Sequence, residues 1–195
     1  MSALAIRAVE LAATVADHRE GPREAFPQVA FAGRSNVGKS SLLNALFGRT
    51  LALVSKTPGK TRTINYYLVN RSVFFVDLPG YGFAKVAHGE RRSWGERVTR
   101  YIEREERLRL VIGLVDPRIP TSPLDVELAA MVRELGRPLL VVATKADQLG
   151  RGAMAAAASR LMADLELPER PLAFSARTGA GKKELLAAIS GAVAA

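Results

Sequence analysis

The sequence predicts an α/β fold in which helices cover both faces of a mixed, mostly parallel sheet of six strands. Apolar runs of strand length alternate along the chain with longer segments whose apolar residues recur at helical spacing. The runs at residues 61–70 and 72–77 have only a short break at Asn70-Arg71 between them, so they predict a hairpin and one antiparallel edge. No repeat or linker divides the 195 residues, and we expect a single domain over residues 1–195 with an N-terminal extension of about residues 1–25.

The other elements are predicted in chain order from their period and their end signals. Residues 28–33 form a buried strand, and residues 40–47 form a helix that closes near Gly48. Ser122 is a suitable N-cap, Pro123 suits the first helical position, and Asp125 completes a capping-box-like start for a helix that ends at Gly136. Further strands are expected at residues 108–116, 138–145 and 171–176, and further helices at residues 153–165 and 182–193.

Composition limits the classes of function. An apolar content of 48% fits a globular fold, and the absence of cysteine excludes disulfides, cysteine nucleophiles and thiolate metal sites. The N-terminal residues carry charges inside their apolar stretch, so we expect a cytoplasmic protein without stable membrane insertion. The net charge of +9 favours a polyanionic partner of the RNA type. One region has five basic residues and no acidic one: Arg49, Lys56, Lys60, Arg62 and Arg71.

The stretch FAGRSNVGKSSLLNAL, residues 31–46, has the spacing of a phosphate-binding loop. Four residues separate Gly33 from Gly38, and Lys39 and Ser40 follow at the start of a predicted helix. The glycines allow close approach of the backbone, and the N–H groups at a helix start have no intrahelical partner and attract anions. Lys39 places a positive charge on the terminal phosphates, and the Ser40 hydroxyl is a suitable magnesium ligand. The loop does not choose between ATP and GTP.

A second motif, Asp77-Leu78-Pro79-Gly80, ends the predicted strand at residues 72–77. An acidic residue beyond a phosphate-binding loop can hold magnesium through water, and the next glycine offers an N–H to the γ-phosphate. Tyr81 then stands where many nucleotide hydrolases carry a water-orienting glutamine. Because a phenol is a poor substitute for that amide, we expect slow intrinsic turnover and assign no catalytic base.

The motif Thr144-Lys145-Ala146-Asp147 lies at another strand end, where ligands bind in open α/β sheets. Guanine presents two adjacent donors, its ring N–H and its exocyclic amine, and an ionised Asp147 accepts both. Adenine offers no such pair, and binding it would leave a desolvated carboxylate unpaired at a cost of about 1–3 kcal/mol. Lys145 is expected either to lay its stem over the base or to brace the phosphate-binding loop. Ser175-Ala176 would supply backbone donors to the guanine carbonyl.

The segments GRSNVGKSS, TPGKTRTINYY, VDLPGYGFAKV, TKAD and FSA together resemble the EngB (YsxC/YihA) family of bacterial GTP-binding proteins. The resemblance runs from about Leu11 to the final helix. It implies the Ras-like G domain of P-loop NTPases, within the TrmE-Era-EngA-EngB-Septin-like GTPase superfamily. Thr144 departs from the commonest base motif, which has Asn there, but it matches the form of this family.

The resemblance implies a magnesium-dependent switch that binds GTP and GDP and hydrolyses GTP slowly. Its expected partner is the precursor of the large ribosomal subunit and its rRNA, not DNA, and the family is also required for normal cell division and septation. Thr61 would join Ser40 as a magnesium ligand, with Thr57 and Thr63 as competing candidates. Asn36 is either a ligand of a potassium ion beside the phosphates or a structural residue of the loop. We expect the protein to be a monomer.

The nucleotide-binding residues are assigned motif by motif. The phosphate-binding loop comprises Gly33, Arg34, Ser35, Asn36, Val37, Gly38, Lys39, Ser40 and Ser41. The first switch comprises Gly59, Lys60, Thr61, Arg62 and Thr63, and the second comprises Asp77, Leu78, Pro79 and Gly80. The base would be held by Thr144, Lys145, Ala146, Asp147, Phe174, Ser175, Ala176 and Arg177.

Two other interpretations stand beside this one. A P-loop ATPase or kinase would need a phosphate-acceptor site and a lid, and it would leave Asp147 unexplained. A septum-associated or membrane-associated scaffold, with incidental hydrolysis, would bind acidic vesicles rather than ribosomal subunits.

Overall fold

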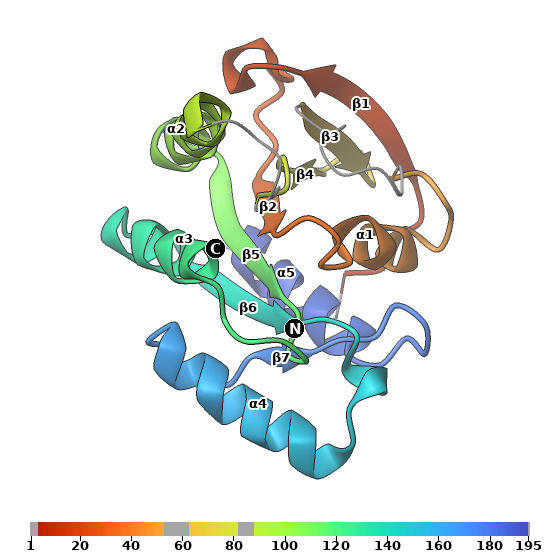
Figure 1. Cartoon of the computed structure of the whole chain (residues 1–195). Coiled ribbons are helices and arrows are strands. Elements are labelled where there is room, and N and C mark those ends of the chain that lie inside the picture. Colours follow the sequence, from red (N-terminus) through yellow and green to blue (C-terminus); the bar gives the residue numbers. More distant parts are fainter. Residues whose placement is uncertain (1–3, 53–62, 82–87, 195) are drawn as a thin grey trace.

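Figure 1 shows the computed structural model, which describes residues 4–52, 63–81 and 88–194, with only the backbone of residues 88–94. Within these ranges a single sheet has the strand order β1-β3-β4-β2-β5-β6-β7. Helices α1 and α5 pack on one face of the sheet, and α2, α3 and α4 pack on the other. The α/β architecture with helices on both faces is therefore confirmed.

The helices and strands have the following bounds. The strands are β1 (Val9–Val15), β2 (Gln28–Gly33), β3 (Ile64–Val69), β4 (Val73–Asp77), β5 (Leu108–Val115), β6 (Leu139–Ala143) and β7 (Leu172–Ala173). The α-helices are α1 (Lys39–Phe47), α2 (His88–Arg104), α3 (Pro123–Glu134), α4 (Arg151–Asp164) and α5 (Lys182–Ala194). Short 3-10 helices are η1 (His18–Glu20) and η2 (Ala146–Gln148).

The parallel part of the sheet runs from β4 to β7. Strand β2 pairs in parallel with β4 and with β5, and β5 pairs in parallel with β6. Every residue of β2 is buried, because helices cover both of its faces. This explains why the strand reads as a continuous apolar run rather than as an alternating one.

The antiparallel side of the sheet corrects the sequence prediction. The predicted hairpin of β3 and β4 is present, and its turn residues Asn70 and Arg71 have φ of 51° and 53°, as a tight hairpin turn requires. However, β3 is not the edge, because β1 pairs with it antiparallel, and the sheet has seven strands instead of six. Val9 alone of β1 is buried, and alanine and glutamate are weak strand formers. The strand forms because β3 offers it a pairing edge.

Helix α3 follows the predicted start and stop signals. The Ser122 hydroxyl accepts a bond from the Asp125 N–H at 3.3 Å, and the Asp125 carboxylate accepts one from the Ser122 N–H at 3.0 Å. At the other end Gly136 has φ of 64°, and Arg137 donates its N–H to the Val132 carbonyl at 3.0 Å. This is the bonding pattern of a glycine-terminated helix end. Both ends of the helix are thus fixed by short-range sequence.

The carboxyl ends of the parallel strands meet along one border of the sheet. The phosphate-binding loop follows β2, the Asp-Leu-Pro-Gly motif begins at the last residue of β4, and the Thr-Lys-Ala-Asp motif follows β6. The Ser175 segment follows β7 on the same border. The topology therefore brings together three motifs that lie far apart in the sequence.

Candidate nucleotide-binding site

The phosphate-binding loop is a tight turn whose glycines are required by geometry. Gly38 caps α1 with φ of 108°, and Asn36 has φ of 64°, so both residues adopt the left-handed region. A Cβ atom on Gly33 would lie 2.9 Å from the Val37 Cγ1 atom and 3.0 Å from the Leu114 Cβ atom. The loop thus packs directly against β5. It leads into the start of α1, where the first N–H groups have no intrahelical partner. This arrangement suits an anion with several oxygen atoms.

Lys39 and Asp77 form an ion pair beneath this loop. The Lys39 Nζ atom donates to the Asp77 Oδ1 atom, and the two side chains are only 10% and 5% exposed. The second carboxylate oxygen, Oδ2, lies 3.4 Å from the Asn65 Nδ2 atom. Lys39, which is predicted to contact the phosphates, and Asp77, which is predicted to hold magnesium through water, are thus adjacent.

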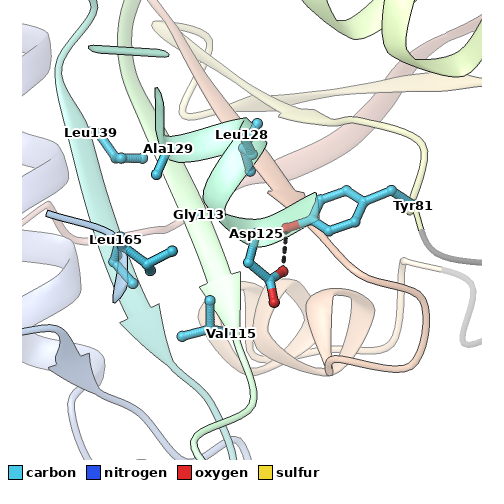
Figure 2. A pocket seen from close by; sticks show the side chains of 9 residues that line it. Tyr81, Gly113, Val115, Asp125, Leu128, Ala129, Leu139 and Leu165 are labelled. Atoms are coloured by element: carbon cyan, nitrogen blue, oxygen red, sulfur yellow. Dashed lines mark hydrogen bonds between the residues drawn. The ribbon is translucent and has the colours of Figure 1, made fainter. Parts of the chain in front are cut away.

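Tyr81 joins the end of the second motif to two other elements (Figure 2). Its N–H donates to the Gly33 carbonyl at 3.3 Å, and its carbonyl accepts from the Ser35 N–H at 2.8 Å. Its phenol points under the start of α3, where it donates to the Asp125 carboxylate at 2.8 Å, beside a small apolar cavity. Burial raises the pKa of the Tyr81 phenol well above its ordinary value, and the Asp125 charge adds to the effect. The phenol is therefore neutral, and it donates its hydrogen bond to the first turn of α3.

Thr144 and Lys145 both contact the phosphate-binding loop. The Thr144 hydroxyl is buried and lies 2.7 Å from the Val37 carbonyl oxygen and 3.0 Å from that of Val115. Lys145 donates from Nζ to the Asn36 carbonyl at 2.9 Å. Of the two roles expected for Lys145, the bracing of the loop is the one that the contacts describe.

Asp116 belongs to this site and was missed by the sequence analysis. It follows β5 and accepts from the Lys145 Nζ atom at 3.0 Å and from the Arg118 Nη2 atom at 2.6 Å. Burial raises the pKa of Asp116, but the hydrogen bonds from Arg118 and Lys145 outweigh it and hold the pKa well below its ordinary value. Its position, an acidic residue directly after a buried strand, was the available signal.

Asp147 lies on η2 and faces the loop that follows β7. Its Oδ1 atom accepts from the Ser175 hydroxyl, and its Oδ2 atom accepts from the Arg177 Nε atom at 2.8 Å. These two hydrogen bonds, first that of Ser175 and then that of Arg177, lower the pKa of Asp147. The carboxylate is therefore ionised at neutral pH, as an acceptor of two base donors must be.

The predicted site residues fall into two groups. Four segments meet at one border of the sheet: residues 33–41, 77–80, 144–147 and 174–177. Phe174 is a core residue. Thr63 lies directly before β3. Thr57, Gly59, Lys60, Thr61 and Arg62 lie outside the described residues.

Two side chains of the described residues fit a magnesium ion. No group of three or more His, Asp or Glu side chains is placed to hold a metal in residues 4–52, 63–81 and 95–194. Magnesium needs no such cage, because it takes one or two protein ligands and completes its shell with phosphate oxygens and water. The Ser40 hydroxyl at the start of α1 and the Asp77 carboxylate have the chemistry for that role.

The fold and the phosphate-binding loop define a P-loop nucleotide-binding protein. A family model described as "50S ribosome-binding GTPase" matches residues 28–145, which include two of the three motifs and the first two residues of the third. The chain is thus a GTPase that binds and hydrolyses GTP.

The particular family follows from the relatives. The chain is 47% identical over 188 residues to the "Probable GTP-binding protein EngB" of Syntrophomonas wolfei subsp. wolfei, covering 96% of this chain and 97% of the relative. A crystal structure of a probable GTP-binding protein engB superimposes with a TM-score of 0.73 at 25% identity, covering 86% of this chain and 98% of that one. The chain belongs to the EngB family.

One further solved structure is similar. It is Era in complex with MgGDPNP and nucleotides 1506–1542 of 16S ribosomal RNA. The TM-score is 0.67 at 25% identity, and the match covers 86% of this chain and 56% of the Era chain.

Proposed function

We propose that this GTPase is a magnesium-dependent switch in the assembly of the large ribosomal subunit. The observation that carries the nucleotide assignment is the ionised Asp147, held by Ser175 and Arg177 beside the phosphate-binding loop. The ribosomal assignment has separate support, given below. The function in cell division and septation comes from the family resemblance alone.

The residues of the site divide the nucleotide between them. Lys39 would contact the terminal phosphates, and the Gly80 N–H would meet the γ-phosphate. Ser40, with Thr61 and through water Asp77, would hold magnesium, which neutralises phosphate charge when bound. Asp147 would accept the guanine donors, while Thr144 and Lys145 hold the phosphate-binding loop from below. Loss of the γ-phosphate would then remove the contacts to Gly80 and Thr61 and change the state of the switch.

Slow hydrolysis follows from the position of Tyr81. Its phenol is bonded to Asp125 under α3, so it does not orient a water at the γ-phosphate. Asn36 remains the candidate ligand of a potassium ion. Its left-handed backbone, with φ of 64°, also suits asparagine for a purely structural reason. A dependence of turnover on potassium over sodium would separate the two roles.

The ribosomal partner is supported by charge and by the relatives. The net charge is +9, and the matching family model carries the description of a 50S ribosome-binding GTPase. Era, a structural neighbour, is seen with a segment of ribosomal RNA. Arg49 and Arg71 of the predicted basic region are exposed, whereas Lys56, Lys60 and Arg62 lie outside the described residues.

The rival interpretations are less well supported. The family assignment removes the reason to consider an ATPase or a kinase. For a membrane scaffold, none of the described helices has the length and apolar character to cross a bilayer. A scaffold could still bind acidic lipid at the membrane surface. The co-sedimentation experiment below distinguishes such binding from binding to ribosomal subunits.

The nucleotide assignment is tested by base exchange. In the Asp147→Asn variant one of the two acceptor oxygens becomes a donor nitrogen, which opposes a guanine donor but can pair with the carbonyl of xanthine. We expect affinity for GDP to fall by about 10⁴-fold and affinity for xanthosine diphosphate to rise, both measured by calorimetry. Thr144→Val is the matched control, because its hydroxyl contacts the loop carbonyls, and it should weaken both nucleotides equally. Unchanged preference for GDP in Asp147→Asn would refute the base assignment.

The ribosomal assignment is tested by co-sedimentation. Large ribosomal subunits and acidic vesicles are mixed separately with the protein, in the presence of GDP or of a non-hydrolysable GTP analogue. We expect co-sedimentation with the subunits that is stronger with the analogue, and that falls with salt by about one unit of log–log slope for each RNA phosphate contacted. Equal binding with both nucleotides would refute the switch, and binding to vesicles alone would refute the ribosomal partner.

A further inference from the structure

A row of three polar side chains crosses the antiparallel part of the sheet and ends at the candidate phosphate site. In the strand pairing Thr14 of β1 lies opposite Asn65 of β3, and Asn65 lies opposite Asp77 of β4. Directly opposed residues of paired strands project on the same face, so the three side chains are neighbours by register. The Thr14 hydroxyl donates to the Asn65 Oδ1 atom at 2.9 Å, and the Asn65 Nδ2 atom lies 3.4 Å from the Asp77 Oδ2 atom.

The polarity of this row has one consistent arrangement. With Thr14 donating to the amide oxygen, the amide nitrogen is the atom turned toward Asp77. The reverse orientation would place the amide oxygen against a carboxylate oxygen, and neither atom carries a proton to share. The Asp77 carboxylate, which can only accept, thus fixes the orientation of the Asn65 amide, and the Thr14 hydroxyl donates to the amide oxygen that faces it.

The two oxygens of Asp77 have separate partners. Oδ1 accepts from Lys39 of α1, and Oδ2 faces the Asn65 amide from β3. Asp77 is 3% exposed, so few other donors can reach it. Rotation of a carboxylate about its last bond is soft, and hydrogen bonds decide its orientation. Once Lys39 turns to the phosphates of a bound nucleotide, Asn65 is the side-chain partner of Asp77 that remains within residues 4–52, 63–81 and 95–194.

We propose that Asn65 is a positioning residue, which holds the Asp77 carboxylate in the orientation that the nucleotide-bound magnesium ion needs. The proposal rests on the assignment of Asp77 to the water-mediated magnesium site made above. Asn65 contacts neither the metal nor the nucleotide, and it acts through Asp77 alone. Partners of this kind, one layer behind a metal site, typically change metal affinity by about 10-fold to 100-fold when removed.

The test compares nucleotide affinity with and without the metal. For the wild type and Asn65→Ala, the dissociation constant of GDP is measured by calorimetry in millimolar magnesium and again in excess EDTA. The ratio of the two constants is the tightening that magnesium contributes. We expect Asn65→Ala to reduce this ratio by about tenfold while the constant in EDTA stays the same. Thr14→Val, which removes the donor to the Asn65 amide oxygen, should reduce the ratio by a smaller factor.

Asn70→Ala is the matched control for a merely structural role. Asn70 directly follows the same strand β3 at its far end, where its side-chain oxygen accepts from the Arg7 and Ala8 N–H groups at 2.8 and 3.1 Å. Its φ of 51° makes alanine strained, so the variant should lose stability yet keep the full magnesium ratio. An Asn65→Ala variant with the wild-type ratio would overturn the proposal. So would an equal loss of the ratio in Asn70→Ala.

A second variant separates failure of this proposal from failure of the magnesium assignment. Asp77→Asn should abolish most of the magnesium ratio. If Asp77→Asn keeps the ratio, the assignment of Asp77 is wrong, and the positioning role of Asn65 falls with it. If Asp77→Asn loses the ratio and Asn65→Ala keeps it, only the positioning role is wrong.

Discussion

The phosphate end and the base end of the site hold their main carboxylates in different ways. At the phosphate end, Asp77 is buried, and its partners Lys39 and Asn65 come from two elements distant in sequence, α1 and β3. At the base end, the partners of Asp147 are Ser175 and Arg177, which both belong to the short loop after β7. The phosphate end is thus part of the packed sheet, whereas the base end is a contact between two loops. Substitutions should affect folding and all nucleotides at the first, and nucleotide selection at the second.

The sharpest test of this difference is Lys39→Ala. The substitution removes a charge from the phosphates and leaves Asp77 buried without its ion-pair partner. We expect the free energy of unfolding to fall by about 3 kcal/mol, which is typical when one member of a buried pair is removed. Affinity for GDP and GTP should fall by about 100-fold or more, measured by denaturation and calorimetry. Lys183→Ala on α5 is the control, because Lys183 is exposed. Near-normal nucleotide affinity in Lys39→Ala would break the comparison.

A smaller effect is expected for Tyr81→Phe. The Tyr81 backbone contacts the phosphate-binding loop, whereas its phenol contacts Asp125 at the start of α3. The variant leaves the Asp125 carboxylate with one donor fewer, and we expect a loss of about 1–3 kcal/mol in the free energy of unfolding. Single-turnover hydrolysis of bound GTP should remain within about twofold of wild type, because the phenol points away from the phosphates. A fall of more than tenfold in that rate, with stability retained, would show that the phenol takes part in the chemistry.

The smallest effect is expected at the base end, for Arg177→Ala. Arg177 is 73% exposed, so loss of its ion pair should change GDP affinity by less than about threefold, and less still in high salt. The proposed guanine contact needs an ionised Asp147, and the hydrogen bonds from Ser175 and Arg177 hold the pKa of Asp147 below its ordinary value. Affinity should therefore stay constant from pH 7 down to about 5 and fall only as the pH drops through the lowered pKa. In Arg177→Ala the fall should begin at a higher pH, as titrations by calorimetry can show. A large loss at neutral pH would mean that Arg177 contacts the nucleotide directly.

Much of the fold could be predicted because it depends on short-range signals. Helix α3 has its capping residues at both ends, and strand β2 is buried along its whole length and apolar after Gln28. The hairpin turn at Asn70 and Arg71 was likewise visible from the break between two strand patterns. Strand β1 was missed, because its burial pattern is weak and the pairing edge of β3 decides its conformation.

The site was predicted by motif, but the direction of its side chains was not. Spacing in the sequence places Thr144 beside the base residues, yet only the packing of β6 against the phosphate-binding loop turns its hydroxyl to Val37. The contacts of Asp116 and Asn65 could not be predicted because their partners lie far away in the chain. Contacts of this kind depend on strand register, which a single sequence does not specify beyond its apolar pattern.

The two edge strands of the described sheet, β1 and β7, are both poorly suited to pair with another strand. Strand β7 has only two residues, and β1 carries an irregularity between Leu11 and Ala13 that interrupts its ladder. Sheets that end in short or irregular strands resist adding further chains to themselves. Removal of the segment before β2 would make the regular strand β3 an exposed edge strand. Such a shortened protein should tend to self-associate by pairing through β3.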